Sequence, residues 1–452
     1  MTFWGRLIRF LSRSSFYLNR RAYYIAGIAA GSYVLSYFFP SLFLAGHILL
    51  VLLGISILVD ILLLYGRPNA IRAERITPER FSNGDENRIQ VRVENDYPFP
   101  VRLEIIDELP VQFQERNWLR TIKSEPGADS TIEYFLRPVQ RGEYVFGDIN
   151  VYAFSPLHLV RRRYIVPAEQ LVKVYPSYIQ MRRYQLLAVS NRLQEAGVKR
   201  IRRIGHSMEF EQIKEYVRGD DYRTINWKAT ARKADLMVNN YTDERSQQIY
   251  CIINKGRVMK MPFNGMTLLD YAVNASLVLS NVALVRHDKA GLITFADTVD
   301  SFLLADKKPA QMNMLQETLY RQQTSYPEPD FEKLYSVIRG RITHRSLLVL
   351  FTNFESIYSL EREMPSLKRI AKYHLLLVVF FENIEMKELT GRKAGTVEDI
   401  YIKTIAEKFA YEKRLMVKEL RKNGIASILT IPENLTVNAV NKYLELKTRM
   451  SI

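Results

Sequence analysis

The stretch Ile204–Arg245 reads IGHSMEFEQIKEYVRGDDYRTINWKATARKADLMVNNYTDER and mixes charged with aromatic side chains. Its acidic and basic residues are interleaved, and aromatic side chains lie among them, including Tyr216, Tyr222, Trp227 and Tyr241. A loop that only had to be soluble would not need so many aromatic side chains. We call this stretch the signature block, and no other part of the sequence is as specific.

The signature block resembles that of the bacterial domain-of-unknown-function 58 family, which has no established reaction. The matching residues are Glu209, Phe210, Glu215, Tyr216, Gly219, Asp220, Asp221, Arg223, Ile225, Trp227, Ala229, Ala231, Arg232, Leu236, Val238 and Glu244. Upstream, Arg141-Gly142-Glu143-Tyr144 and Ser155-Pro156 resemble the family's Arg-Gly-x-Tyr strand and Asp-Pro turn, with Ser155 in place of the aspartate. The resemblance implies a von Willebrand factor A-like C-terminal domain that ends in the helix containing Tyr443–Lys447.

Composition and charge limit the class of protein. The 452 residues are 47% hydrophobic and 25% charged, which is typical of a folded chain with two or three domains. The single cysteine, Cys251, excludes an intramolecular disulfide and, inside an apolar strand, indicates a buried inert thiol. Of the net charge of +16, residues 161–203 carry +9. Such a concentration attracts anionic lipid or nucleic acid, but no nucleic-acid-binding motif accompanies it, so we expect a solvated face beside a membrane.

Two uncharged segments near the start, Ala22–Phe39 and Leu42–Val59, predict a transmembrane helical hairpin. Five arginines precede the first segment and three follow the second, whereas the turn carries no charge: Arg6, Arg9, Arg13, Arg20, Arg21, Arg67, Arg72 and Arg75. Basic flanks favour the cytoplasmic side, so we expect both termini and the soluble domains there. Within 1–21, apolar residues at helical spacing predict an interfacial amphipathic helix.

The soluble part shows two kinds of periodicity. From Arg88 apolar residues alternate with polar ones in short runs, which indicates an all-β, sandwich-like module. After the signature block, apolar runs such as Ile249–Ile253 and Leu347–Phe351 alternate with helical segments such as Leu268–Val285 and Val397–Lys422. This alternation predicts a mainly parallel α/β sheet, and the resemblance makes it a von Willebrand A-like, Rossmann-like domain.

These patterns predict a multi-domain chain with five parts. They are an interfacial segment (1–21), two transmembrane helices (22–66), a β-sandwich-like module (70–180), a basic linker with the signature block (181–245) and the von Willebrand A-like domain (246–452).

A von Willebrand A domain usually binds a divalent cation through Asp-x-Ser-x-Ser after its first strand, with a threonine and a second aspartate from later loops. At these positions the chain has Asn254, Gly256 and Val258, and the second aspartate is replaced by Asn353. A hard cation needs oxygen ligands and a carboxylate. We therefore expect a degenerate metal site, no metal and no cofactor.

Enzyme signatures are missing: the sequence has no phosphate-binding glycine loop, no dinucleotide fingerprint and no nucleophile elbow. The acidic residues of the signature block are the remaining candidates. At helical spacing, Met208, Phe210, Ile213 and Val217 predict a helix over 207–218, followed by a second helix that Asp220 or Asp221 caps. The carboxylates could then be structural, dock a partner, or form a hydrolytic site.

We expect a non-catalytic, inner-membrane-anchored scaffold or adaptor. The family resemblance implies a MoxR-type AAA+ ATPase as its partner in a chaperone-like or assembly role. It is also compatible with other von Willebrand A-like membrane proteins as further partners. The alternatives are a carboxylate-dependent hydrolase that uses the Glu209–Asp221 segment and a membrane-proximal nucleic-acid binder that uses residues 161–203.

Overall fold

The computed structural model describes residues 16–448 except for 116, 190–207, 218–219, 221, 234, 244–245, 384–385, 387–388, 390 and 392–394. For residues 187–189, 208–212, 240–243 and 448 it describes the backbone alone. The expected interfacial helix before residue 16, and the basic residues 199–203, lie outside the described residues. The chain divides into two compact units, Met1–Tyr175 and Pro176–Ile452, so it is the multi-domain mixed α/β protein that the sequence predicts.

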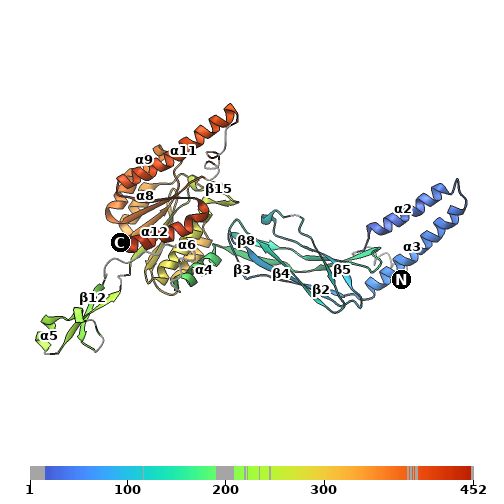
Figure 1. Ribbon diagram of the computed structural model, residues 1–452, viewed down its shortest axis with the longest axis horizontal. Coiled ribbons are helices and arrows are strands. Elements are labelled where there is room, and N and C mark those ends of the chain that lie inside the picture. Colours follow the sequence, from blue (N-terminus) through green and yellow to red (C-terminus); the bar gives the residue numbers. More distant parts are fainter. Residues whose placement is uncertain are drawn as a thin grey trace. The chain divides into compact units, whose positions relative to one another are not determined.

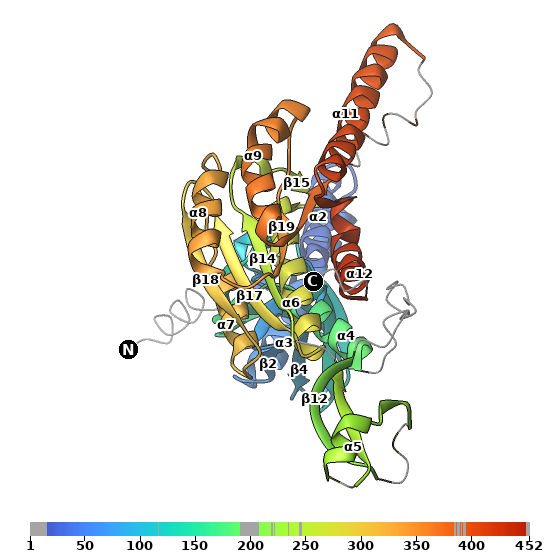
Figure 2. The ribbon, with the colours of Figure 1, turned by 90° about the vertical axis from the view of Figure 1, so that its left-hand side faces the viewer.

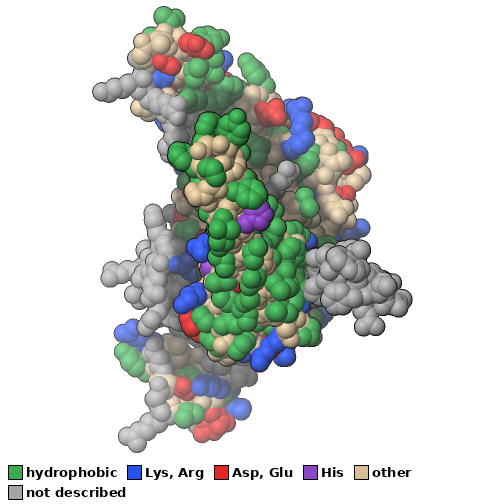
Figure 3. Space-filling view, turned by 90° about the vertical axis from the view of Figure 1, so that its right-hand side faces the viewer, with side chains coloured by type: hydrophobic (Ala, Val, Ile, Leu, Met, Phe, Trp, Pro, Cys, Tyr) green, Lys and Arg blue, Asp and Glu red, His purple; other side chains and the backbone are tan. Residues whose placement is uncertain are grey.

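The first unit begins with a short strand, β1 (Phe16–Leu18), and two apolar helices, α2 (Arg20–Leu35) and α3 (Ser41–Tyr65). Asn19 caps α2. The two helices pack against each other, and apolar side chains cover the surface that they expose (Figure 3). With 25 residues α3 is about 38 Å long, whereas the 16 residues of α2 make about 24 Å. The first helix is thus shorter than the predicted 22–39 segment.

Two described helices are long and apolar enough to cross a membrane by length and composition. In α3 only 17% of the apolar window is buried, whereas in α6 (Leu268–Val285) the fraction is 83%. Burial on that scale makes α6 the core helix of the second unit, because a lipid-facing helix leaves most of its side chains uncovered.

A buried carboxylate near the end of α3 helps to attach this helix to the rest of the first unit. Asp60 is fully buried. It accepts hydrogen bonds from Ser155 Oγ at 2.5 Å, from the Leu159 amide at 3.2 Å and from the Leu157 amide at 3.4 Å. The resembled family has an aspartate at the position of Ser155. In this chain Ser155 instead donates to a carboxylate from another element, that of Asp60 in α3. At the end of the helix, Arg162 Nη1 donates to the Leu64 carbonyl at 2.7 Å.

The remainder of the first unit is a β-module of three sheets. Its strands are β2 (Ile71–Ile76), β3 (Arg80–Ser82), β4 (Asn87–Asn95), β5 (Val101–Asp107), β6 (Arg120–Ser124), β7 (Asp129–Leu136), β8 (Gly142–Phe146), β9 (Ile149–Phe154), β10 (Val160–Val166) and β11 (Gln170–Tyr175). The sheets have the orders β1-β10-β9-β5-β6, β2-β4-β7 and β3-β11-β8. In β4, β5 and β7 alternate residues point inward, as Ile89, Val91 and Val93 do in β4, and the buried residues of the module form one apolar core.

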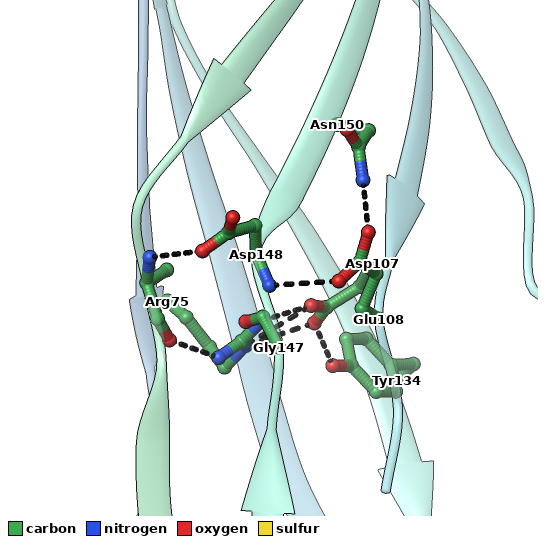
Figure 4. A network of polar contacts seen from close by, with 8 residues as sticks. Arg75, Asp107, Glu108, Tyr134, Gly147, Asp148 and Asn150 are labelled. Atoms are coloured by element: carbon green, nitrogen blue, oxygen red, sulfur yellow. Dashed lines mark hydrogen bonds and ion pairs between the residues drawn. The ribbon is translucent and has the colours of Figure 1, made fainter. Parts of the chain in front are cut away.

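One ion pair is buried inside this core (Figure 4). Arg75 donates from Nε to both oxygens of Asp107 at 3.1 Å, and Tyr134 also donates to Asp107. The remaining Arg75 donors reach the Ala168 carbonyl at 2.6 Å and the Gly147 carbonyl at 2.9 Å. Burial and the neighbouring carboxylate raise the pKa of Tyr134. The network joins β2, β5, β7 and the β8–β9 turn around one pair of charges.

The second unit contains a six-stranded sheet (Figure 2). Its strands are β14 (Gln248–Asn254), β17 (Lys289–Phe295), β18 (Val299–Asp306), β19 (Leu347–Phe351), β20 (Leu375–Phe381) and β21 (Ala426–Thr430). The order is β18-β17-β14-β19-β20-β21, and every neighbouring pair is parallel except β17–β18. The predicted strands at Ile249–Ile253, Gly291–Phe295, Leu347–Phe351, Leu375–Phe381 and Ser427–Ile431 are confirmed as β14, β17, β19, β20 and β21. The antiparallel edge strand β18 is not among the predicted strands, because its exposed and half-buried residues lack a clear apolar alternation.

Helices cover both faces of this sheet. Odd-numbered residues of β14, such as Cys251, pack with α4 (Tyr178–Val189), α6, α7 (Gln311–Tyr320) and α12 (Leu435–Thr448). Even-numbered ones, such as Ile252, pack with α8 (Phe331–Arg341), α9 (Ile357–Tyr373) and α11 (Val397–Lys422). A small hairpin, β15 (Pro262–Phe263) and β16 (Met266–Thr267), precedes α6. The helix α4, in the stretch expected to be a linker, packs against α6.

We predict that Asp107→Asn destabilises the protein by about 3–5 kcal/mol, because Arg75 would stay buried without a counter-charge. The measurement is the free energy of unfolding of the detergent-solubilised chain in denaturant.

The matched control is Glu133→Gln, which breaks the exposed pair between Glu133 and Arg88 and should cost at most about 1 kcal/mol. Equal costs for the two variants would show that the buried pair has no special role in the β-module.

Candidate functional site

The signature block folds into a two-stranded ribbon with a short helical insertion (Figure 1). Strands β12 (Met208–Glu215) and β13 (Met237–Asp243) pair antiparallel, with an irregularity between Phe210 and Gln212. Between them lie a 3-10 turn at Tyr222–Thr224 and helix α5 (Trp227–Lys233). The helix is attached by Asn226, whose amide N–H donates to the Met237 carbonyl at 2.8 Å, and by Thr230 Oγ1, which accepts from the Met237 amide at 3.0 Å.

The helix predicted over residues 207–218 is wrong, since the described part of this range is strand β12 and its end. The apolar residues of this segment also fit a strand with one irregularity, and pairing with β13 provides the backbone partners that an isolated short helix would lack.

The predicted cap is not found at Asp220, and Asp221 lies outside the described residues. Asp220 accepts from the Val217 amide at 3.0 Å and from Lys214 Nζ at 2.9 Å, so it closes the turn after β12. These donors lower the pKa of Asp220. The α5 helix instead uses Asn226, whose Oδ1 accepts from the Ala229 amide at 3.0 Å.

The small residues Ala229 and Ala231 that follow Trp227 in the sequence predict a buried ring, but Trp227 is exposed. Its exposed fraction is 70%, and that of Tyr222 is 69%. The half-buried residues of α5 are Ala229 and Thr230, and the Thr230 hydroxyl contacts the ribbon. The small residues therefore allow α5 to lie against β13, and Trp227 at the first turn points elsewhere.

The other signature residues fall into two groups. Glu215, Arg223 and Arg232 are exposed and Tyr216 is half-buried; Glu215 lies 4.0 Å from Lys233 Nζ. For Glu209 and Phe210 only the backbone is described, and Gly219, Asp221 and Glu244 lie outside the described residues. A shared role for these carboxylates stays a prediction.

A second candidate site lies at the carboxyl edge of the six-stranded sheet. After β14 the chain forms β17 and β18 on one side of that strand, and β19, β20 and β21 then follow on its other side. The direction in which successive strands are added therefore reverses between β14 and β19. Ligands of open α/β sheets bind at such a switch point. Here Asn254 Nδ2 donates to Thr352 Oγ1 at 2.9 Å, and Asn254 Oδ1 accepts from the Gly256 amide at 2.7 Å.

The expected metal-ligand positions are occupied by internal contacts. Asn254 uses both ends of its amide as just described. A Cβ at Gly256 would meet the Pro327 carbonyl at 2.9 Å and Pro329 Cδ at 2.8 Å, so no ligand side chain fits there. Neighbouring Lys255 is buried and pairs with Asp300. No group of three or more His, Cys, Asp or Glu side chains that could hold a metal is found among the described residues.

Beside this edge, Lys413 of α11 borders an apolar pocket of 220 Å³ whose other lining residues include Phe263, Phe381 and Phe409. Lys413 Nζ donates to Asn353 Oδ1 at 2.9 Å and to the Phe354 carbonyl at 2.5 Å. Burial lowers the pKa of Lys413 to about 8, although Glu355 and Glu412 oppose the shift. Asn353 replaces the second aspartate of the usual metal site, and here its side-chain oxygen accepts from the Lys413 amine and orients it.

Sequence reasoning missed both Lys413 and Asp60. Lys413 lies on the face of α11 that also carries Met416 and Leu420, and a lysine at a core-facing helical position was the available signal. Asp60 was visible as the lone acidic residue within the apolar run that ends at Tyr65. Cys251 is buried as expected, and burial raises the pKa of its thiol to about 11.

Comparison with known proteins confirms the family resemblance. Residues 212–399 match the family described as "Protein of unknown function DUF58". "Uncharacterized protein YeaD" of Bacillus subtilis (strain 168) is 27% identical over 180 residues, which are 38% of this chain and 44% of that protein. The match therefore spans less than half the length of this relative.

Solved structures with similar parts are distant. The VWA domain of SpRpn10 aligns with 44% of this chain and 95% of its own length at 11% identity and a TM-score of 0.28. The CARDB domain of the PF1109 protein from Pyrococcus furiosus aligns with 23% of this chain and 86% of its own length at 16% identity and a TM-score of 0.17.

We predict that Lys413 makes the protein more stable as the pH rises from about 8 to about 10.5. Below this window both the folded and the unfolded chain hold the proton, and the full cost of burying the ammonium is present. Within the window the unfolded chain binds more protons, so the free energy of unfolding rises, by about 1–3 kcal/mol. The measurement is denaturant unfolding at pH 7 and at several values up to 10.5.

Lys413→Met serves as the comparison, because other titrating groups contribute equally to both proteins. The difference between the two pH profiles should be flat below pH 8 and rise above it. A difference that is flat throughout would mean that the amine is solvated and keeps its ordinary pKa.

Proposed function

We propose that this chain is a bacterial inner-membrane protein whose hairpin of α2 and α3 crosses the bilayer and whose β-module and second unit lie in the cytoplasm. The support is the length and exposed apolar surface of α3, together with arginines at both ends of the hairpin. The exposed aromatic residues Tyr37, Phe38 and Phe39 follow the shorter α2 and extend its apolar surface.

In this proposal the second unit is a von Willebrand A-like scaffold without catalytic chemistry. A mainly parallel sheet with helices on both faces supports that fold. At its carboxyl edge the described polar groups hydrogen-bond one another: Asn254 with Thr352, and Asn353 with Lys413. A site whose polar groups satisfy each other favours a rigid scaffold over an enzyme.

The observation that carries the proposal is the exposure of large side chains on the ribbon. Trp227, Tyr222 and Val217 have exposed fractions of 70%, 69% and 63%. Tryptophan and tyrosine dominate the binding energy of protein interfaces, and exposed clusters of this kind mark interaction sites. We infer that the ribbon docks a protein partner. The family resemblance makes a MoxR-type AAA+ ATPase the first candidate, in a chaperone-like or assembly role.

The two alternatives have less support. Of the described carboxylates in the Glu209–Asp221 segment, Asp220 closes a turn and Glu215 is exposed to solvent. For a nucleic-acid surface, the basic run at 161–163 is engaged within the first unit: Arg162 binds the end of α3, and Arg163 Nε donates to Asn150 Oδ1 at 2.9 Å.

We predict that Trp227→Ala and Tyr222→Ala each lose most of the capture of a purified MoxR-type ATPase, while the free energy of unfolding changes by less than about 0.5 kcal/mol, as is usual for exposed positions. If Trp227 were buried, Trp227→Ala would instead lower the free energy of unfolding by several kcal/mol. The measurements are co-purification of the detergent-solubilised variants with the ATPase under ATP and under a non-hydrolysable analogue, and thermal unfolding.

The matched control is Tyr358→Ala, because Tyr358 is an aromatic residue of the same unit with an exposed fraction of 77%. It should capture the ATPase as the unchanged chain does. The docking proposal fails if the ribbon variants bind the ATPase like the control, or if they lose binding only because they unfold.

A further inference from the structure

A basic row crosses the end of the β-module that adjoins the apolar helices. In the register of the sheet Arg102 of β5 lies directly opposite Lys123 of β6 on one side and Phe154 of β9 on the other. Phe154 in turn lies opposite Arg161 of β10. Residues directly opposite in a sheet share a face, so three cations and an aromatic ring form one line across four strands.

Part of this row borders a pocket of 480 Å³. Its cationic lining residues are Arg102 and Lys123, and its other lining residues are Phe99, Pro100, Thr121, Ile122, Phe154, Ser155, Pro156 and His158. No carboxylate lines the pocket. Burial and the neighbouring Arg21 and Arg102 lower the pKa of His158, so its imidazole is neutral at pH 7 and can act as a hydrogen-bond donor there. The Arg102 guanidinium lies 5.8 Å from the centre of the Phe154 ring, and Arg102 makes no ion pair with any described residue.

Two like charges directly opposite each other destabilise a sheet. Lys123 is 71% exposed and its ammonium lies 3.0 Å from Glu125, so solvent and this carboxylate weaken the repulsion, but Glu125 does not line the pocket. An anion held between Arg102 and Lys123 would remove the cost. The pocket therefore has the charge of an anion site and apolar walls beside it.

The position of the pocket identifies the source of the anion. The loop that contributes Ser155, Pro156 and His158 binds Asp60 of α3 and, through the His158 carbonyl, accepts from Asn19 Nδ2 at 2.8 Å directly before α2. From Ser41 to Asp60 the helix rises about 30 Å, which is the thickness of the hydrocarbon layer. With α3 in a bilayer, this loop lies at the level of the headgroups.

The exposed side chains near this loop are of the kinds found at the level of lipid headgroups. Tyr23 and Tyr24, in the first turn of α2, have exposed fractions of 64% and 70%, and Leu157 of the loop is 48% exposed. Tyrosines of this kind are enriched where a membrane meets water, and an exposed leucine beside them can enter the same region.

We propose that the pocket formed by Arg102, Lys123 and His158 binds the phosphate of an anionic phospholipid headgroup in the leaflet beside the β-module. The inference rests on the proposed insertion of α3 into a membrane. A bound headgroup would neutralise the Arg102–Lys123 pair and fix the β-module against the membrane surface, in addition to the attachment through Asp60.

The test uses the full chain in a neutral detergent and measures its affinity for fluorescent phosphatidylglycerol. The double variant Arg102→Gln/Lys123→Gln is compared with Arg88→Gln/Lys173→Gln, which removes the same charge from exposed positions of the same module outside the pocket. We expect the first variant to bind about tenfold or more weakly and the second to bind like the unchanged chain. Equal losses in both would mean attraction to charge alone and would overturn the proposal.

Further arms separate the sources of phosphate. Phosphatidylcholine, which has no net charge, and soluble glycerol phosphate should both compete poorly with phosphatidylglycerol. If glycerol phosphate binds as tightly as the lipid, the site serves a soluble phosphate and the lipid proposal is wrong. Extraction of the chain from cell membranes by alkaline carbonate would contradict the membrane anchor itself, whereas an integral chain without a preference for phosphatidylglycerol would contradict only the lipid site.

Discussion

The buried carboxylate of Asp60 is the interaction on which the first unit depends. A charge near the end of an apolar helix must find donors, and Ser155 and two amides of the β9–β10 loop supply them. The same loop receives the start of α2 through Asn19. Both helices are therefore attached to one turn of the β-module, and the position of that turn relative to the helices fixes where the rest of the module meets a membrane.

In both units, buried polar groups are hydrogen-bonded or ion-paired to other groups of the same unit. In the β-module Asp107 neutralises Arg75, and at the edge of the six-stranded sheet Asn353 and the Phe354 carbonyl hold Lys413. In each case internal partners hold the charge or the amine in place. The exposed aromatic residues lie elsewhere, on the ribbon β12–β13, and the basic row crosses strands β5, β6, β9 and β10 of the first unit.

Periodicity predicted much of this fold, and its failures have physical causes. Four of the five parallel strands, β14, β17, β19 and β20, were visible because they are buried on both faces, as in Leu347–Phe351, whereas the edge strand β21 is mostly half-buried. The ribbon β12–β13 was misread as helical because a two-stranded, largely exposed ribbon needs no strict alternation. The burial of Trp227 was predicted wrongly because small residues next to an aromatic residue have two explanations. They can make room for a buried ring or, as here, allow a helix to lie close to a strand. Asp60, Lys413 and the Arg102–Lys123 pair depend on contacts between distant segments, which spacing in one sequence does not reveal.

The most direct test of a membrane-anchored docking protein is the side of the membrane on which its parts lie. The native Cys251 is buried and its thiol pKa is raised to about 11, so it does not compete for a maleimide. Tyr37→Cys in the hairpin turn and Tyr358→Cys in the second unit introduce exposed thiols. In intact cells a membrane-impermeant maleimide should label only the Tyr37→Cys chain, and the Tyr358→Cys chain should react only after the membrane is opened. Labelling of the Tyr358→Cys chain in intact cells would contradict the account.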